Sequence, residues 1–296
     1  MSSDKHISII INPYSGSGFS KRKYALLKRK LDEWKLNSKL HFIRKSNSPY
    51  EFIESELKTG SKLFVVIGGD GTVNSVAKSL LGKEAVLAII PNGSGNGLAR
   101  HLHISRNFSR SVSIIRSCKI AAIDYGVVND HPFFCTSGVG FDAHVSHIFS
   151  KKRKRGFLTY LKVILAEFPG YKKEKYQISF EDKQFTVRAF LITMANASQF
   201  GNNAFISPAA KIDDGFLDLC IIRPFPVYYA PILGLEVLTK RITSSKLYNS
   251  ARVTEVTIQR NGPGWAHIDG DPVFLPSKIK YKIVAKGLKV LVPEAK

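Results

Sequence analysis

A turn at residues 68–72, Gly-Gly-Asp-Gly-Thr, has the residue types needed to hold a phosphate group. It follows a short apolar run (63–67) and precedes a stretch suited to a helix (73–81). Glycines let backbone N–H groups approach a ligand, and a helix N-terminus offers unpaired donors and the positive end of a dipole. Asp70 is compatible with a phosphate only if a Mg²⁺ ion lies between them. The turn therefore predicts a phosphate site that uses magnesium.

Two more turns of this kind lie at 12–18 and 91–97. The turns at 68–72 and 91–97 lack the Gly-Lys-Ser/Thr ending of a Walker A loop, and they lack the full spacing of a dinucleotide-binding turn. All three turns follow short β-rich runs, so we expect them at the carboxyl ends of parallel strands. One rim of one sheet would then carry a single nucleotide site.

Asp269-Gly270-Asp271 is the best candidate for a catalytic base, because a β-like run ends there in two carboxylates. Phosphoryl transfer needs a group that deprotonates the attacking hydroxyl. Repulsion between two carboxylates at i and i+2 makes one of them take up a proton more readily, which suits a general base. Asp-Gly is also a favoured hairpin dipeptide, so the residues alone leave an ordinary turn open.

The first third of the chain alternates between strand-like and helix-like stretches. Its β-rich runs are 7–11, 40–44, 63–67 and 86–90. This alternation predicts a parallel sheet with helices. The expected helices are 20–35, 49–58, 73–81, 98–102 and 108–117.

From about residue 120 short β-like segments separated by turns predict a mainly antiparallel β domain. Helices are expected within it at 156–168 and 226–240. The expected strands are 120–128, 132–137, 175–181, 184–195, 216–222, 251–260, 266–269 and 278–284.

The composition limits the class of protein. With 296 residues and 44% hydrophobic content, the chain can bury the core of one large or two medium domains. Three widely spaced cysteines (Cys118, Cys135 and Cys220) give no disulfide framework or metal-ligand spacing, which fits a reducing compartment. We find no signal-peptide pattern and no apolar run near the roughly 18 residues of a membrane helix. We therefore expect a soluble, cytoplasmic protein.

The net charge of +21 suits nucleic acid, an anionic membrane face or a polyphosphate substrate. The densest basic run is 151–155, and no zinc finger, RNA-recognition signature or heptad pattern accompanies it. We therefore expect no nucleic-acid partner. The run itself is either a solvated loop or a membrane-facing patch, and the sequence leaves both open.

Three motifs together closely resemble the diacylglycerol kinase and sphingosine kinase catalytic family, nearest to its soluble bacterial members. They are the turn at 68–72, Asn-Pro-Tyr-Ser-Gly at 12–16 and Gly-Ser-Gly-Asn at 93–96. NAD kinases and phosphofructokinases share the Gly-Gly-Asp-Gly turn, so the other motifs carry the specificity. The resemblance implies that the nucleotide is held by Asn12, Pro13, Ser15, Gly16, Gly68, Gly69, Asp70, Gly71, Thr72, Val73, Asn74, Gly93, Ser94, Gly95 and Asn96.

The resemblance implies two domains. One would be an α/β parallel-sheet nucleotide-binding domain at 1–122, similar to that of NAD kinases and phosphofructokinases and joined by a returning segment, 286–296. The other would be an antiparallel β-sandwich at 123–285 that receives the lipid, with apolar side chains from 133–168 and 190–206 lining the site. The implied activity is transfer of the γ-phosphoryl of ATP to a membrane lipid, at the inner face of the membrane. A homodimer is possible.

The family's site residues map onto this chain one by one. Asp269 matches its general base. Asp271 stands where the family usually has Glu, so its side chain is shorter by one methylene. Asp70 and Asp124 match the acids that hold the catalytic Mg²⁺ through waters. A structural Mg²⁺ is implied at the side chain of Asp214 and the carbonyls of Lys211 and Phe216.

Two departures from the family bear on the substrate. Many bacterial members have Asp where this chain has Gly97, and Gly-Ser-Gly-Asn is closer to the sphingosine and ceramide kinase branch. His144 stands where sphingosine kinases place an acid for the substrate amine, which favours a neutral lipid. Diacylglycerol, converted to phosphatidic acid in phospholipid biosynthesis, is the leading substrate. The alternatives are a sphingoid-base or ceramide kinase, an NAD kinase, and a catalytically silent nucleotide-binding membrane regulator.

Overall fold

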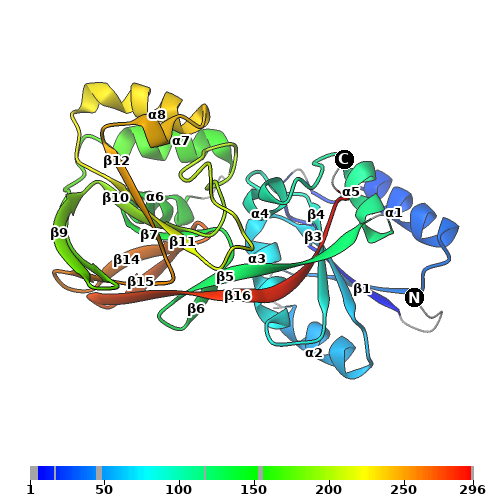
Figure 1. The fold of residues 1–296 in the computed structure, drawn as a ribbon. Coiled ribbons are helices and arrows are strands. Elements are labelled where there is room, and N and C mark those ends of the chain that lie inside the picture. The colour runs from blue at the N-terminus through cyan, green and yellow to red at the C-terminus, as the bar shows by residue number, and fades with distance from the viewer. Residues whose placement is uncertain (1–5, 17, 45–48, 117, 153–155, 295–296) are drawn as a thin grey trace. The chain divides into compact units, whose positions relative to one another are not determined.

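The structure is a computed structural model that describes residues 6–16, 18–44, 49–116, 118–152 and 156–294. The chain forms two compact units. Unit 1 comprises residues 1–123 and 286–296, and unit 2 comprises residues 124–285. Both ends of the chain therefore belong to unit 1 (Figure 1). Within the described residues no helix is both long and apolar enough to cross a membrane.

Unit 1 is built on a parallel sheet in the order β2-β1-β3-β4, as the alternating pattern predicts. The end of β16 adds a further parallel strand beside β4, where Lys289 pairs with Val86. Every residue of β1 and β3 is buried, as expected for strands with both faces covered. The strands are β1 (Ile7–Ile11), β2 (Ser38–Phe42), β3 (Leu63–Gly68), β4 (Val86–Pro91) and β16 (Lys278–Val292).

The helices of unit 1 follow from local sequence. In α1 the Ser20 hydroxyl accepts the Lys23 N–H and caps the helix, and Leu27 and Leu31 form its buried stripe. The expected helix 108–117 is shorter and ends in a 3₁₀ turn. The helices are α1 (Lys21–Glu33), α2 (Tyr50–Lys58), α3 (Asp70–Leu80), α4 (Gly97–His101), α5 (Phe108–Val112) and η1 (Ser113–Ile115).

A buried carboxylate ties α2 to β1 and β2. The Glu56 side chain is 0% exposed, accepts hydrogen bonds from Ser8 Oγ (3.1 Å) and pairs with Lys39 Nζ (2.5 Å) and His6 Nε2 (2.6 Å). Burial opposes ionisation of Glu56, but the hydrogen bonds from Lys39, His6 and Ser8 outweigh it and lower the pKa. The ionised carboxylate therefore stabilises unit 1.

We expect Glu56→Gln to lower the free energy of unfolding by about 2–4 kcal/mol at neutral pH, because it removes one partner of a buried ion pair. Chemical denaturation measures this. The control is Glu54→Gln, also on α2, which has a weaker pair with Lys83 at 3.4 Å and should cost less than about 1 kcal/mol. Because the folded-state pKa is lowered, the contribution of Glu56 is present above its ordinary pKa and is lost as the pH falls through the folded value. Wild type and Glu56→Gln should therefore converge in acid, and a gap that stays constant with pH would contradict this.

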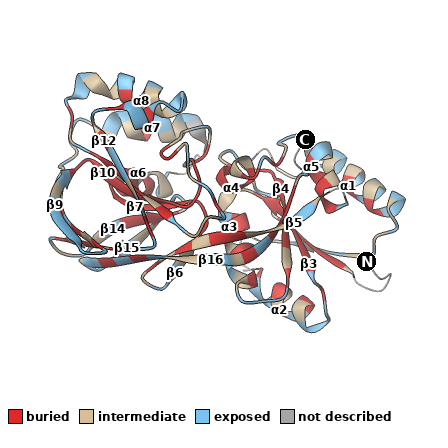
Figure 2. Ribbon diagram, in the orientation of Figure 1, coloured by how far each residue is buried: buried red, intermediate tan, exposed pale blue. Residues whose placement is uncertain are grey.

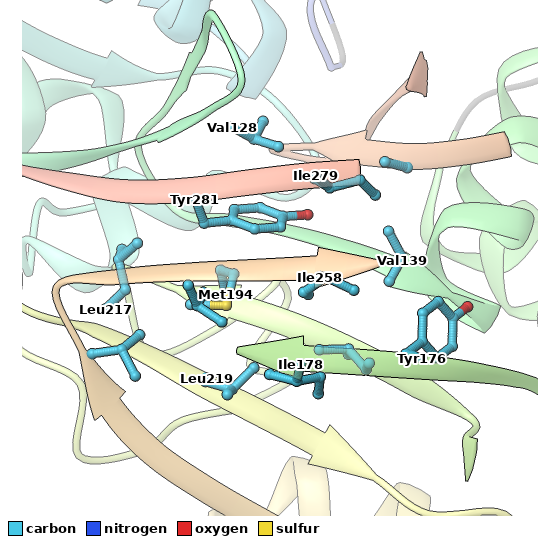
Figure 3. Close-up of a cluster of buried hydrophobic side chains, with 14 of the residues drawn as sticks. Val128, Val139, Tyr176, Ile178, Met194, Leu217, Leu219, Ile258, Ile279 and Tyr281 are labelled. Atoms are coloured by element: carbon cyan, nitrogen blue, oxygen red, sulfur yellow. The ribbon is translucent and has the colours of Figure 1, made fainter. Parts of the chain in front are cut away.

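Unit 2 is an antiparallel sandwich. Its six-stranded sheet has the order β12-β11-β10-β7-β14-β15, and its other sheet continues from the first part of β16 through β13 and β8 to β9. Apolar side chains from both sheets form the core, including Val139, Met194, Ile258 and Ile279 (Figure 3). The strands are β6 (His131–Phe133), β7 (Thr136–Gly140), β8 (Glu174–Phe180), β9 (Lys183–Ala189), β10 (Leu191–Ala195), β11 (Leu217–Ile222), β12 (Tyr248–Val253), β13 (Glu255–Arg260), β14 (Gly264–Ile268) and β15 (Asp271–Leu275). β5 (Lys119–Val128) leads into this unit.

Several expected strands are wrong in their extent. The stretches 184–195 and 251–260 are each two strands, because the chain passes from one sheet to the other at Phe190 and Thr254. The stretch 132–137 also divides, between β6 and β7. A strand at 278–284 continues to Val292, because its later residues pair with β4.

Helices cover an aromatic cluster on unit 2. They include α6 (Phe141–Ser150), which the sequence reading missed, α7 (Phe157–Glu167) and α8 (Ala230–Leu238). The last two agree with the expected helices at 156–168 and 226–240. Short 3₁₀ turns, η2 (Val227–Tyr229) and η3 (Ile242–Ser244), flank α8.

Candidate active site

The three glycine turns of unit 1 pack against one another, backbone to backbone. A Cβ on Gly16, which has φ +57°, would lie 2.2 Å from the Asn92 carbonyl oxygen. A Cβ on Gly93 would lie 2.5 Å from the Cα of Gly69. Neither position can hold a side chain without moving the backbone. The structure thus brings the predicted turns to one rim of the sheet.

Side chains from the first turn fasten it to the start of α3. Asn12 Nδ2 donates to Thr72 Oγ1 at 2.8 Å, and the Gly69 N–H donates to Ser15 Oγ at 3.2 Å. Val73 and Asn74 lie in the first turns of α3, and Asn74 is buried. The helix begins after Gly69 without a side-chain cap. This arrangement of glycines and a helix start is typical of a phosphate site.

The carboxylate of Asp70 clamps the third turn. Its Oδ2 accepts the Asn96 N–H at 2.7 Å and its Oδ1 accepts the Gly97 N–H at 2.6 Å. Gly95 passes close by, because a Cβ there would lie 2.6 Å from Asp70 Oδ2. Each carboxylate oxygen can accept a second hydrogen bond, so Asp70 fits a metal held through water.

Sequence reasoning missed two cations at this rim. Lys23 Nζ donates to Asn92 Oδ1 at 2.6 Å and to the Gly18 carbonyl at 3.1 Å, which joins the first turn to the third. Arg100 Nε donates to the Gly95 carbonyl at 2.8 Å. Each of the two lies about one helical turn after a glycine turn, and this spacing could have identified them from the sequence.

In unit 2, Asp269 lies at the tip of the β14–β15 hairpin. Asp269 and Gly270 have φ of +50° and +87°, and Ile268 pairs with Asp271, so these are the two residues of a tight turn. The hairpin reading is therefore correct as a description of the backbone. Asp271 begins β15 and is exposed.

The Asp269 carboxylate sits in a nest of three successive N–H groups. Its Oδ2 accepts from Phe134 at 2.9 Å, and its Oδ1 accepts from Cys135 at 2.7 Å and Thr136 at 3.0 Å. The Asp269 N–H donates to the Thr136 carbonyl at 2.8 Å. An ordinary hairpin does not need these bonds, and they fix the carboxylate in one orientation.

A buried imidazole supports the same hairpin. His267 Nε2 lies 3.0 Å from Asp142 Oδ2, which also accepts from Thr193 Oγ1 at 2.7 Å. The Gly270 N–H points at His267 Nδ1 at 3.4 Å. These contacts link α6 and β10 to the turn that carries Asp269.

Asp124, a predicted metal acid, lies fully buried beside the nest. Its Oδ2 accepts the Gly215 N–H at 2.7 Å. The amide of Asn196 donates to the carbonyls of Asp124 and Phe134, at 2.9 and 2.8 Å. The Asn196 Oδ1 is buried and has no hydrogen-bond partner among the described residues. Asn196 therefore couples Asp124 to the strand segment that holds Asp269, a connection that sequence reasoning missed.

The Asp214 side chain of the predicted structural metal site has an arginine as its partner. Asp214 forms an ion pair with Arg252, and the Arg252 guanidinium lies 4.3 Å from the centre of the Phe216 ring. The other carboxylate oxygen of Asp214 accepts the Phe216 N–H at 3.2 Å. In the part of the chain that is described, no group of three or more His, Cys, Asp and Glu side chains could hold a metal ion. The structural Mg²⁺ at Asp214 and the carbonyls of Lys211 and Phe216 stays a prediction, and Arg252 would compete with it for the Asp214 carboxylate.

We expect the melting temperature of the nucleotide-free wild type to be the same in EDTA and in excess Mg²⁺. The guanidinium already balances the Asp214 charge, and a second cation there would be repelled. Arg252→Gln should lower stability by less than about 1 kcal/mol, because the pair is partly exposed. This variant alone should gain stability with Mg²⁺. Arg188→Gln, an exposed arginine on β9, is the control. A wild type that Mg²⁺ stabilises and Asp214→Asn makes insensitive would contradict this.

His144, the residue used to favour a neutral lipid, has a partner. Its Nε2 lies 2.8 Å from Glu167 Oε2 on α7. Apolar side chains from the stretches expected to line a lipid site, including Phe141, Val163, Phe190 and Ile206, are packed together in a buried cluster. This cluster is part of the core that the helices cover.

Comparison with known proteins agrees with this arrangement. Residues 6–128 match the model of the diacylglycerol kinase catalytic domain, and residues 136–292 match that of the YegS C-terminal NAD kinase beta sandwich-like domain. A solved structure from Bacillus anthracis has a TM-score of 0.82 at 19% identity and covers 99% of this chain and 97% of that one. At that identity the likeness shows the fold alone.

Among the sequence relatives, two have names that state an activity and a third is uncharacterized. A Pseudomonas aeruginosa protein named "Probable lipid kinase YegS-like" is 29% identical over 245 residues, 81% of this chain and 80% of its own. A Bacillus subtilis protein named "Diacylglycerol kinase" is 26% identical over 226 residues, 74% of each chain. The match to an uncharacterized Synechocystis protein, at 26% identity, covers 94% of this chain and 64% of that relative. The chain thus belongs to the family of lipid kinases that join a diacylglycerol kinase catalytic domain to a YegS-type β-sandwich domain, and it is an enzyme of that family.

Proposed function

We propose that this lipid kinase transfers the γ-phosphoryl of ATP to the free hydroxyl of diacylglycerol, giving phosphatidic acid. The observation that carries the proposal is the nest that fixes the Asp269 carboxylate. A relative of similar length named as a diacylglycerol kinase supports the choice of acceptor. The reaction would take place where a cytoplasmic, peripheral enzyme meets the inner face of the membrane, as a step of phospholipid biosynthesis.

The nucleotide would be held by the packed turns of unit 1. Backbone N–H groups at the start of α3 donate to phosphate oxygens, and the helix dipole favours their charge. Asp70 and Asp124 would hold Mg²⁺ through water. The ion would neutralise charge on the phosphates. The exposed Asp271 is assigned to contact with the nucleotide or its metal.

Asp269 acts as the general base in this proposal. It accepts the proton of the lipid hydroxyl as the hydroxyl oxygen bonds to the γ-phosphorus and the bond from phosphorus to the bridging oxygen of ADP breaks. A carboxylate already held by three N–H groups does not have to reorient, which lowers the entropic part of the barrier.

The acids near α6 favour a neutral acceptor over a sphingoid base. Asp142 is buried against His267 and Thr193, and Glu167 pairs with His144. A cationic amine would have to compete with these contacts. Diacylglycerol has no such charge.

The test is transfer of label from γ-labelled ATP in mixed micelles that contain diacylglycerol, monoacylglycerol, sphingosine, ceramide or undecaprenol, with NAD as a soluble control. The proposal predicts labelled phosphatidic acid as the main product. Label on sphingosine or ceramide would show that diacylglycerol is not the acceptor, but phosphoryl transfer from ATP to a lipid hydroxyl would still hold. Label on NAD alone would show that the acceptor is not a lipid. A protein that labels nothing would favour a silent nucleotide-binding regulator.

A further inference from the structure

Helix α7 is apolar on two opposite faces. Its inner face packs on the core of unit 2 through Val163, Tyr160 and Ile164. Its outer face carries Leu158, which is 73% exposed, and Leu165, which is 66% exposed. A surface helix normally turns polar residues outward, so a helix with apolar residues on both sides indicates a second apolar surrounding.

Helix α8 repeats the pattern. Leu233 is buried and Val237 packs beside it, whereas Leu235 is 62% exposed. Its proline at the N-terminal turn and its flanking 3₁₀ turns fix where the helix begins. Two neighbouring helices of one unit therefore present outward apolar side chains. We call this surface the α7–α8 face, made up of Leu158, Leu161, Leu165, Ile232, Leu235 and Leu238.

The two helices belong to one surface. Val163 of α7 and Leu233 of α8 lie in the same buried cluster. Figure 2 shows exposed residues along both helices. The two helices therefore cover the same buried cluster, and each of them turns apolar side chains outward.

The segments around the face are strongly basic. The described residues 151–152, 156–175 and 223–246 together contain ten Lys and Arg but three Asp and Glu. Lys162, Lys172, Lys240 and Arg241 among them are exposed. A second copy of the chain would bring the same positive charge against this face, which disfavours self-association. Apolar side chains surrounded by cations are complementary to a partner that has an apolar interior and an anionic surface.

We propose that the α7–α8 face docks on an anionic lipid bilayer. The leucines and Ile232 enter the boundary between headgroups and acyl chains, and the surrounding Lys and Arg lie among the anionic headgroups. The inference deepens the proposed function, because it names the surface through which a kinase for a membrane lipid reaches its acceptor. Binding to a bilayer can be measured without ATP, so the two claims can fail separately.

The experiment is co-sedimentation of the full chain, without nucleotide, with vesicles of phosphatidylcholine alone or with phosphatidylglycerol added. The test variants are Leu158→Gln with Leu165→Gln on α7, and Ile232→Gln with Leu235→Gln on α8. The matched control is Ile120→Gln, a similarly exposed side chain on β5. Circular dichroism verifies that each variant is folded. Phosphorylation of a short-chain diacylglycerol dissolved below its micelle concentration reports catalysis without a membrane.

We expect wild type and Ile120→Gln to bind the anionic vesicles and each double variant to bind at least tenfold more weakly. Binding should fall steeply between low and physiological salt. Equal binding by all proteins would overturn the proposal, as would double variants that bind normally but lose a concentration-dependent dimer. Weak vesicle binding by the double variants with normal turnover of the dissolved substrate would support it. If no protein phosphorylates the dissolved lipid, the proposed function fails, while the vesicle result still decides this inference.

Discussion

Asp269→Asn is expected to lower kcat for lipid phosphorylation by about 10²–10⁴-fold, because the amide cannot take the proton of the hydroxyl. Asparagine tolerates the left-handed backbone at this position. It also keeps one oxygen that can accept from the nest of Phe134, Cys135 and Thr136. The turn should therefore persist, with a loss of stability of about 1–2 kcal/mol. Initial rates at saturating substrates, together with ATP affinity measured by calorimetry, test this.

Asp130→Asn is a matched control, because Asn129-Asp130 forms another two-residue hairpin turn in which the carboxylate is exposed. It should leave kcat within about twofold of wild type. The base assignment would be wrong if Asp269→Asn retained most of its kcat, or if its loss only followed the unfolded fraction. The kcat of Asp271→Asn should lie between those of Asp130→Asn and Asp269→Asn. Its main effect should be on the apparent affinity for ATP.

Asp70→Asn should cost both stability and nucleotide binding. The carboxylate accepts from two N–H groups, at Asn96 and Gly97. An amide offers one acceptor oxygen and turns its own N–H₂ toward the other donor, so one charge-assisted bond is lost and the third glycine turn is released. We expect a decrease of about 2–3 kcal/mol in the free energy of unfolding. ATP affinity, measured without turnover, should fall at least tenfold.

Asp32→Asn, on the exposed side of α1, is the control for a change of charge on unit 1. It should change neither quantity measurably. A variant at Asp70 that kept the stability of wild type but lost the effect of Mg²⁺ on ATP binding would show that this carboxylate serves a metal and not the turn. The clamp predicts that stability falls even in EDTA.

The sequence predicts unit 1 well, because its signals are local. The strands β1, β3 and β4 are short apolar runs that end in turns with their own glycines, so the parallel sheet and the place of the turns follow from neighbouring residues. Unit 2 was harder to place for a physical reason. At Phe190 and Thr254 the chain crosses between sheets without a Gly or Pro to mark the corner, so two strands look like one. Helix α6 was missed because its aromatic and β-branched residues also suit a strand.

The site residues divide in the same way. Asn12, Asp70 and the glycines are marked by their motifs, and the structure brings them together. The contacts that give Asp269 its fixed position come from residues more than 130 positions away in the chain. No periodicity reports such contacts, and the same holds for Asn196 beside Asp124. Arg252 illustrates the converse, because the motif around Asp214 is present while a distant strand supplies a cation that the motif does not predict.

The most direct test of Asp269 as the base of a diacylglycerol kinase is a single-turnover reaction, with the enzyme in excess over γ-labelled ATP and diacylglycerol present in anionic vesicles. We expect the label to appear in phosphatidic acid in one exponential phase with wild type, and this phase to slow by at least a hundredfold with Asp269→Asn while ATP remains bound. Label released only as inorganic phosphate, or an equal rate of phosphatidic acid formation by both proteins, would contradict this assignment.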